Sequence, residues 1–473
     1  MKKISQCRAC GSTSLRPAFV IESAAASAGG DVRRGEANLA RGLFGGEGFA
    51  ASGASAYRYV RCDSGQNAEA CGLVQNERLG AAPMAPPPSG LYRSNRSHLR
   101  AVATEALELV SGRDCAALDI GCSDGTLLSF YPRWVERYGV DRADVVEQIG
   151  AWAWRARAAF PSIEIDRALG DRKFDIVTAI SVLEEVDEPR AFLARIKALL
   201  APDGVLALET LYAPMTLTRT SVEAVMDGKA ALYSLGALER LLRECDLKIF
   251  RGAVTDKNGG SVRLFACHAD VDAYDFDPWY ERLARLWDEE NALALHMPAP
   301  YQAFQGRAEE ARAAFADFMV AARRRGEVAH IVGAGEAARE IFHWAGPGVS
   351  AIEAAVAPND VAGDAADGAR LCPGGPPLVS EAESRALEPD YFIAPSALKR
   401  EMLERWREPI LRGATFLFPT PTPHIVDAGN YAAELGKSLA DGDGAGGVET
   451  LRAILSAAGG LRVVADAGAR KRA

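Results

Sequence analysis

The stretch Leu118-Asp119-Ile120-Gly121-Cys122-Ser123-Asp124-Gly125 decides the fold of this chain. Its first half ends a short apolar strand over Ala116 to Ile120. Gly121 and Gly125 then allow a tight turn, because glycine reaches backbone conformations that other residues avoid. A helix over Leu127 to Glu136 is expected to follow. The order strand, turn, helix predicts a β-α unit whose backbone comes close to a ligand at the turn.

Acidic residues in this turn indicate which ligand it holds. A dinucleotide site prefers three glycines spaced for a pyrophosphate, whereas Asp119 and Asp124 would repel one. The two acids suit a ligand with a cationic amino group and a sulfonium. The second strand, Tyr138 to Asp141, ends in an acid about 20 residues further on, where a carboxylate accepts both ribose hydroxyls. The pattern indicates S-adenosylmethionine; the alternative is a structural β-α turn without a ligand.

Strands and helices alternate around this unit, which predicts a mainly parallel sheet with helices on both faces. A second α/β unit starts at Glu327, after a mostly helical stretch over 277–325. The elements expected in the first unit are strands at Phe174–Ile180, Val205–Glu209, Leu247–Phe250 and Ser261–Cys267, and helices at Pro189–Leu200 and Ser234–Glu244. Those of the second unit are strands at Val328–Val332, Ile352–Val356, Tyr391–Ala394 and Thr415–Pro419, and a helix at Ala337–Trp344.

The bulk composition excludes several classes of protein. A length of 473 residues suggests about three domains, and a net charge of −9 argues against a generally basic nucleic-acid surface. No run of about 18 apolar residues exists, so we expect no membrane partner. The first residues hold no apolar signal region, so we expect a cytoplasmic protein.

Four of the nine cysteines lie in the first 71 residues, at Cys7, Cys10, Cys62 and Cys71. In a reducing compartment, clustered thiols more often bind a metal than form disulfides. Four thiolates in a tetrahedron make a structural zinc site, and unligated thiols are the alternative. The loop Asp63–Ala70 between the last two cysteines would then have to bulge out.

The chain resembles the class I methyltransferases and, more narrowly, the three-domain sugar C-methyltransferases that modify nucleotide-linked keto-deoxysugars. The segments that carry this resemblance are Cys7–Gly11 with Cys71–Gln75, Leu118–Leu128, Asn258–Arg263, and the unit from Gly333 to Pro419. The resemblance implies an α/β fold: a class I methyltransferase Rossmann-like sheet flanked by a small N-terminal zinc module and a second, C-terminal Rossmann-like α/β domain. It implies cofactor contacts from Asp119, Gly121, Cys122, Ser123, Asp124, Gly125, Asp141, Ser181, Val182 and Leu183.

The sequence pattern and this resemblance together suggest the domain boundaries. We place the zinc module, with an Ala/Gly-rich insertion, at residues 1–82 and the methyltransferase domain at 83–270. A helical segment and the C-terminal Rossmann-like domain occupy 271–430, and a helical tail occupies 431–473.

The chain departs from the family where the catalytic base is expected. The family has a Tyr-His-Glu-His run there, but Met226 to Ser234 contains no histidine, and none occurs between His98 and His268. Methylation of a carbon beside a ketone needs a base for the α proton and a donor for the enolate. The remaining candidates, each of which alone is more often a packing or solvated residue, are Glu209, Tyr212, Asp227, Lys229 and Tyr233. Glu185 stands where relatives often have a histidine and reads as a solvated residue at a helix start.

Several functions fit this sequence. The first is methyl transfer from S-adenosylmethionine to a nucleotide-linked sugar or a related small metabolite. Because oxygen and nitrogen already carry a lone pair, their methylation needs a weaker base and is an alternative. A second alternative is a non-catalytic subunit that binds the cofactor. A third is an NAD-dependent oxidoreductase that uses Gly333-Ala334-Gly335, with Asp360 on the ribose. The sequence leaves the acceptor and the oligomeric state open.

Overall fold

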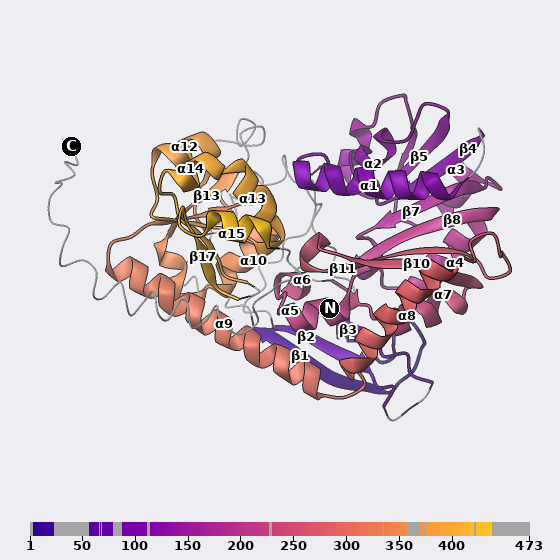
Figure 1. Ribbon diagram of the computed structural model, residues 1–473, viewed down its shortest axis with the longest axis horizontal. Coiled ribbons are helices and arrows are strands. Elements are labelled where there is room, and N and C mark those ends of the chain that lie inside the picture. The colour runs from indigo at the N-terminus through magenta and orange to yellow at the C-terminus, as the bar shows by residue number, and fades with distance from the viewer. Residues whose placement is uncertain are drawn as a thin grey trace, which may run out of the picture.

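The computed structural model describes residues 3–22, 56–78 except 66 and 68, 88–110, 114–226, 229–333, 335–357, 369–420 except 373, and 422–437. These residues form three sheets of four, seven and six strands. Figure 1 shows two lobes, one built on the seven-stranded sheet and one on the C-terminal sheet, with the strands β1 and β2 and the long helix α9 below them. The predicted α/β fold class is confirmed.

The central sheet has the strand order β10-β11-β8-β7-β4-β5-β6. Only β11 runs antiparallel to its neighbours among the paired strands of this sheet. The chain leaves β4 first toward β5 and later toward β7, so a switch point lies between β4 and β7, where ligands bind beyond the carboxyl ends of the strands. The strands are β4 (Cys115–Ile120), β5 (Val135–Asp141), β6 (Trp154–Arg157), β7 (Phe174–Ile180), β8 (Leu200–Leu211), β10 (Leu247–Thr255) and β11 (Ser261–His268).

Helices cover both faces of this sheet because its strands alternate their side chains between two apolar layers. On one face, α1 (Arg93–Leu109) packs Leu99 and Val102 in the same cluster as Ala207 of β8. On the other face lie α4 (Pro189–Leu199), α7 (Leu235–Arg243) and α8 (Asp277–Ala292), with Leu206 of β8 in their cluster. Ser234, the first residue of the predicted helix, caps α7: its hydroxyl accepts a hydrogen bond from the N–H of Ala237 at 3.1 Å.

Three details of the prediction for this domain are wrong. The helix expected over Leu127–Glu136 is the single turn α2 (Thr126–Ser129), and β5 already begins at Val135. Strand β6 was not expected, because its half-buried and exposed residues at the sheet edge give no apolar run. The strand expected at Val205–Glu209 is longer, because β8 already begins at Leu200 and ends at Leu211.

The N-terminal module is a four-stranded sheet in the order β1-β2-β3-β9. Its own strands are β1 (Leu15–Glu22), β2 (Ala56–Cys62) and β3 (Val74–Asn76). The fourth, β9 (Ala231–Leu232), lies in the chain between β8 and β10 of the central sheet and pairs antiparallel with β3. The module is therefore completed by residues far along the chain.

The C-terminal sheet has the order β14-β13-β12-β15-β16-β17, parallel except for β17. Thr415–Pro419 was expected to close this unit, but β17 follows it as an antiparallel edge strand. The strands are β12 (Ala329–Val332), β13 (Ile352–Ala357), β14 (Leu378–Ser380), β15 (Tyr391–Ile393), β16 (Phe416–Phe418) and β17 (His424–Val426). The helices of this part are α9 (Ala299–Arg324), α10 (Glu336–Trp344), α12 (Glu381–Ala386), α13 (Lys399–Arg405), α14 (Arg407–Leu411) and α15 (Tyr431–Gly436).

Helix α9 joins the parts of the molecule (Figure 1). Phe304 packs edge-on against Phe19 of β1, with ring centroids 4.7 Å apart. Further along the helix, Phe315 stacks against Trp344 of α10 at 6.2 Å. Among the described helices, none is long and apolar enough to span a membrane.

Candidate cofactor and catalytic site

The glycines of the turn after β4 are required by local geometry. Gly121 has φ 75° and Gly125 has φ 76°, values that disfavour residues with a side chain. A Cβ atom on Gly121 would lie 2.4 Å from Cγ2 of Val182, so the loop after β7 packs directly on the turn. Gly121 itself remains exposed at the switch point of the sheet.

Three carboxylates surround this turn. Asp119 is buried and accepts a hydrogen bond from the Thr178 hydroxyl at 2.6 Å. Asp141 accepts hydrogen bonds from the N–H groups of Ser123 and Ala143, both at 2.8 Å. Burial raises the pKa of Asp119 to about 7, the Thr178 hydrogen bond opposes this, and the charges of Asp141 and Asp124 add to it. A cationic ligand would relieve this concentration of acids.

The predicted cofactor residues lie together around the turn. Ser181, Val182 and Leu183 follow β7, and Ser181 has φ 58°. Cys122 and Leu183 are buried in the core, so their side chains do not reach the surface of the turn. The segment before α1 lies across the turn, because Gly90 donates its N–H to Asp124 at 2.9 Å.

A buried ion-pair network, which we call the His98–Glu209 cluster, extends from the same edge of the sheet. Nε2 of His98 on α1 lies 2.7 Å from Oε1 of Glu209, near the end of β8. Nε of Arg263 donates to the other oxygen of Glu209 at 2.7 Å, and its Nη1 donates to Glu105 at 2.8 Å. Burial would raise the pKa of Glu209, but the hydrogen bonds and charges of His98 and Arg263 lower it below its usual value.

Residues 257–258 connect this cluster to the loop after β7, which begins at Ser181. They belong to the 3₁₀ turn η3 (Lys257–Gly259) between β10 and β11. Asn258 donates its amide to the Ser181 hydroxyl at 3.1 Å, and Nζ of Lys257 donates to Asn95 on α1 at 2.6 Å. Burial lowers the pKa of Lys257, which the neighbouring carboxylate of Glu209 opposes.

The sequence pointed to Glu209 but missed its partner. Glu209 was a candidate because it ends a strand facing the cofactor cleft. His98 was noted only as lying before the region without histidines, since its pairing with a residue 111 positions away is set by the fold. Helical periodicity around His98 assigns no role to its half-buried side chain.

Lys229 and Tyr233 are engaged in other contacts. Nζ of Lys229 lies 2.6 Å from Glu185, which also accepts a hydrogen bond from Arg142 at 2.8 Å. Glu185 in η2 (Leu183–Glu185) is therefore an ion-pair residue, and the expectation of a solvated side chain is wrong. The Tyr233 hydroxyl is buried and donates to the carbonyl of Leu183 at 3.5 Å. Asp227 lies outside the described residues.

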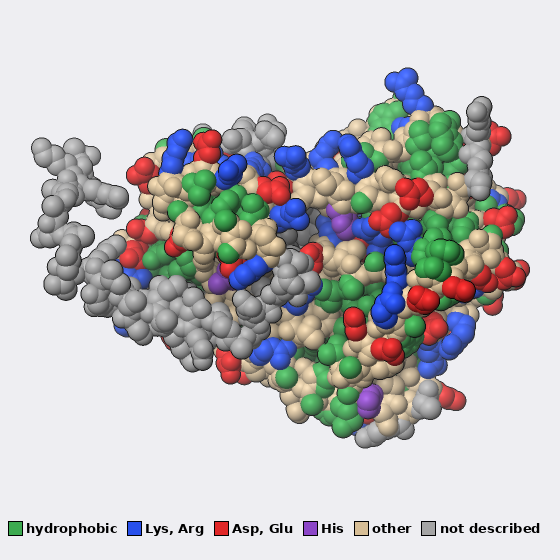
Figure 2. All heavy atoms as spheres, viewed as in Figure 1, with side chains coloured by type: hydrophobic (Ala, Val, Ile, Leu, Met, Phe, Trp, Pro, Cys, Tyr) green, Lys and Arg blue, Asp and Glu red, His purple; other side chains and the backbone are tan. Residues whose placement is uncertain are grey.

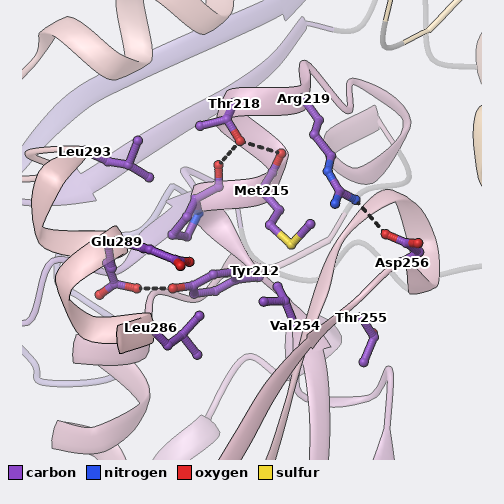
Figure 3. Close-up of a pocket in the computed structure, with 12 residues that line it drawn as sticks. Tyr212, Met215, Thr218, Arg219, Val254, Thr255, Asp256, Leu286, Glu289 and Leu293 are labelled. Atoms are coloured by element: carbon purple, nitrogen blue, oxygen red, sulfur yellow. Dashed lines mark hydrogen bonds and ion pairs between the residues drawn. The ribbon is translucent and has the colours of Figure 1, made fainter. Parts of the chain in front are cut away.

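Tyr212 lines a cavity of about 510 Å³ between α5 (Ala213–Arg219), the end of β10 and α8 (Figure 3). Its hydroxyl donates to Glu290 at 2.9 Å, and burial together with that carboxylate raises the pKa of Tyr212. Glu290 also accepts the N–H of Leu235 at 2.6 Å, at the start of α7. Tyr212 thus joins the strand end to two helices. Thr255, at the edge of this cavity, donates to Glu209 at 3.2 Å.

The four N-terminal cysteines lie together, with all four Sγ atoms within 4.8 Å of one another. The sulfurs of Cys7 and Cys71 are 3.6 Å apart, as are those of Cys10 and Cys62. Thiolates bound to zinc at about 2.3 Å are roughly 3.8 Å apart along the edge of a tetrahedron. The four ligands therefore fit a structural zinc ion.

The carboxyl edge of the C-terminal sheet is occupied by a side chain of the methyltransferase domain. Its switch point lies between β12 and β15. Glu223 of α6 (Glu223–Met226) accepts hydrogen bonds there from the N–H and hydroxyl of Ser396, at 3.0 and 2.7 Å, and from the Thr420 hydroxyl. A carboxylate at this position would repel a pyrophosphate, which disfavours a dinucleotide in this domain.

Two family models match the chain. One, described as a methyltransferase domain, covers residues 92–251, and the other, described as a C-methyltransferase C-terminal domain, covers residues 256–421. The C-methyltransferase NovU of Streptomyces niveus is 24% identical over 240 residues, which are 49% of this chain and 54% of NovU. A tRNA U34 carboxymethyltransferase of Idiomarina loihiensis is 29% identical over 119 residues, 22% of this chain and 35% of that protein. The chain spans about half or less of the length of these curated relatives.

Solved methyltransferase structures are also similar to part of the chain. An S-adenosylmethionine-dependent methyltransferase from Clostridium acetobutylicum has a TM-score of 0.30 and 14% identity, over 36% of this chain and 91% of that chain. The 1,6-didemethyltoxoflavin-N1-methyltransferase of Burkholderia thailandensis has a TM-score of 0.29 and 16% identity, over 41% of this chain and 98% of that chain.

The family matches and the strand order of the central sheet make residues 92–251 a class I, S-adenosylmethionine-dependent methyltransferase domain. The C-terminal match and the similarity to NovU support a C-methyltransferase family for this chain.

Proposed function

We propose that the protein transfers a methyl group from S-adenosylmethionine to a carbon of a nucleotide-linked keto sugar or a related small metabolite. The observation that carries the proposal is the grouping of Asp119, Asp124 and Asp141 around a glycine turn at the switch point of the central sheet. Bound S-adenosylmethionine supplies an electrophilic methyl group. Asp141 would accept its ribose hydroxyls, and the other two acids would attract its cationic end.

The acceptor is proposed to lie between the central and C-terminal domains. In Figure 2 the surface is hollowed between the two lobes, and Lys and Arg side chains gather around the hollow. Such a basic surface attracts the phosphates of a nucleotide-linked sugar. The match to a C-methyltransferase C-terminal domain and the similarity to NovU support methylation at carbon.

The zinc ion is proposed to be structural. All four of its ligands would be thiolates of the N-terminal module, which leaves no coordination position for a substrate. Cys10 and Cys62 would tie the first turn of the module to the end of β2. The ion would thereby fix the sheet to which β9 of the methyltransferase domain adds its strand.

A non-catalytic role is a second candidate, because Tyr212 and Tyr233 are engaged in the fold and the histidine run of the family is missing. In that case the protein would bind the cofactor and methylate nothing. Binding alone therefore tests the first half of the proposal, and turnover tests the second.

Calorimetric titration with S-adenosylhomocysteine tests the cofactor site. We expect micromolar binding by the wild type and loss of binding by Asp141→Ala. Asp288→Ala, at an exposed position of α8, is the matched control and should bind like the wild type. NADH should not bind. Failure of the wild type to bind S-adenosylhomocysteine would overturn the proposal, and binding of NADH would redirect it to the turn at Gly333. For a wild type that binds, turnover is tested with methyl-labelled S-adenosylmethionine and a panel of nucleotide-linked sugars.

A further inference from the structure

We infer that His98, oriented by Glu209, is the general base that removes the proton from the acceptor carbon. This inference rests on the proposed C-methylation and supplies the base that the missing histidine run leaves open. It is carried by the position of His98, by its hydrogen-bonding geometry and by the engagement of the other candidates.

His98 lies next to the loop after β7, which is expected to line the cofactor site. The carbonyl of Glu209 accepts the N–H of Ser181 at 2.8 Å, so the partner of His98 is bonded directly to the loop after β7. On α1, His98 follows Asn95 by three residues and lies on the same side of the helix. Asn95 accepts a hydrogen bond from Nζ of Lys257. The next residue, Asn258, donates to the Ser181 hydroxyl. The imidazole therefore stands at the carboxyl edge of the sheet, where the methyl group would be presented.

The tautomer of His98 follows from its partners. Arg263 donates to Glu209 at 2.7 Å and favours its ionised form, which only accepts hydrogen bonds. The proton of the neutral imidazole is then on Nε2, which faces Glu209 at 2.7 Å, and Nδ1 carries the lone pair. Nη2 of Arg263 lies 3.2 Å from Nε2 and 3.5 Å from Nδ1. At the longer distance a hydrogen bond to Nδ1 is weak, so the guanidinium leaves that lone pair for a proton.

The exposure of the two residues matches a base and its orienting partner. The Glu209 side chain is fully buried, whereas that of His98 is 18% exposed. A substrate therefore reaches the imidazole but not the carboxylate. The same division of roles, with a buried acid holding a histidine that moves the proton, occurs in other catalytic sites.

The proposed reaction begins with a proton transfer to His98. Nδ1 of His98 takes the proton from the carbon beside the ketone, and the electrons of the C–H bond form the enolate. The enolate carbon takes the methyl group, and the C–S electrons remain on sulfur, giving S-adenosylhomocysteine. The ketone is restored, and His98 releases its proton to solvent at its exposed edge. The ammonium of Lys257 is the nearby cation for the enolate oxygen.

The other candidates in this part of the chain are held by existing contacts. Lys229 pairs with Glu185, Tyr212 donates to Glu290, and Tyr233 is fully buried. Among the described histidines, the remaining ones lie at the end of β11 or beyond α8. His424 is 20% exposed and lies beside Lys399 and Glu434, but it belongs to the C-terminal sheet. Of the histidines that the structure describes, His98 is the one that is hydrogen-bonded to a carboxylate next to the loop after β7.

The experiment uses the full chain and dTDP-4-keto-6-deoxyglucose as the acceptor probe. Exchange of the acceptor's α proton with deuterated water is measured with S-adenosylhomocysteine bound. Methyl transfer is measured separately with labelled S-adenosylmethionine. His98→Gln keeps an amide that donates to Glu209 but has no basic nitrogen. We expect it to bind S-adenosylhomocysteine like the wild type and to lose at least about 100-fold in both rates. His268→Gln, at the end of β11, is the control and should retain both rates.

Further readouts separate a base from a structural residue. His98→Gly should recover part of its exchange rate when imidazole is added, and Glu209→Gln should slow exchange without abolishing it. Exchange at the wild-type rate in His98→Gln would overturn the inference. So would loss of exchange without imidazole rescue in a His98→Gly protein that still binds S-adenosylhomocysteine. A wild type that binds the cofactor product but neither exchanges nor methylates the probe would reject the keto-sugar acceptor and the base together, whereas a wild type that does not bind it would reject the proposed function itself.

Discussion

The carboxylate of Glu223 in the methyltransferase domain accepts two hydrogen bonds from Ser396 of the C-terminal domain, 173 positions along the chain. Both side chains are buried, and Ser396 begins the 3₁₀ turn η5 (Ser396–Leu398) after β15. A second carboxylate bridges the domains in the opposite direction, because Glu401 of α13 accepts the N–H of Ser94 on α1 at 2.9 Å. Each domain thus places an acid on donors of the other.

The first prediction concerns this contact. Glu223→Gln keeps the shape of the side chain but removes its charge and one of the two oxygens that accept from three donors. We expect the free energy of unfolding to fall by about 1–3 kcal/mol, the cost of leaving a buried polar group unsatisfied. Denaturant titration measures it. Glu239→Gln, at an exposed position of α7, should stay within about 0.5 kcal/mol of the wild type; equal effects of the two substitutions would refute the assignment.

The second prediction concerns the turn itself. Gly121→Ala would place a methyl group 2.4 Å from Val182 at a φ of 75°. Either the turn or the loop after β7 must move, so we expect binding of S-adenosylhomocysteine to weaken at least tenfold. Calorimetry on the folded variant measures this change. Gly170→Ala shares a positive φ but meets no atom within 4 Å, so it should retain wild-type affinity.

The third prediction is a pH dependence of cofactor binding. Because burial raises the pKa of Asp119 to about 7, this carboxyl is largely neutral at pH 6 and largely ionised at pH 8. A cationic cofactor binds the ionised form better, so its affinity should rise between these two pH values and level off above. Asp119→Asn should abolish the rise. An affinity that is constant from pH 6 to 8 in the wild type would contradict the prediction.

The same group should affect the stability of the ligand-free protein in the opposite direction. The folded chain keeps the proton of Asp119 up to about pH 7, whereas the unfolded chain releases it near its ordinary pKa of 3.8. Its contribution to the free energy of unfolding therefore decreases as pH rises from about 3.8 to about 7 and levels off above that. Asp119→Asn should reduce this slope in pH-dependent denaturation.

The fourth prediction concerns the metal. The purified chain should hold one zinc ion per molecule by elemental analysis, because four thiolates converge within 4.8 Å. Cys10→Ser should lose the ion and unfold at lower denaturant concentration. Cys245→Ser, at a free buried cysteine elsewhere, should keep it. Full zinc content in Cys10→Ser would show that the cluster is not the ligand set.

Elements set by local patterns could be predicted from the sequence. The buried strand Phe174–Ile180 has the predicted bounds, and the helix capped by Ser234 starts where the cap places it. Strand β6 was not predicted because exposed arginines alternate with its half-buried Trp154 and Ala156. Strand β9 has two residues and exists only through its pairing with β3. Short edge strands of this kind are determined by tertiary contacts.

In the candidate site, too, contiguous motifs could be predicted, whereas contacts between distant residues could not. The cofactor turn and the first cysteine pair are contiguous, so spacing alone pointed to them. The His98–Glu209 cluster joins a helix before the turn to a strand long after it, and no local pattern links the two. The hydrogen bond of Tyr212 could not be predicted either, because its partner Glu290 lies 78 positions away on α8.

The pairing of β3 with β9 has a consequence for how the chain folds during synthesis. The N-terminal sheet cannot be completed until residues 231–232 leave the ribosome, about 150 residues after β3. At roughly 5–20 residues per second, the backbone edge of β3 stays unpaired for on the order of ten seconds. In a nascent chain, the four cysteines would therefore be available to bind zinc while the edge of β3 is still unpaired, until residues 231–232 have been synthesised.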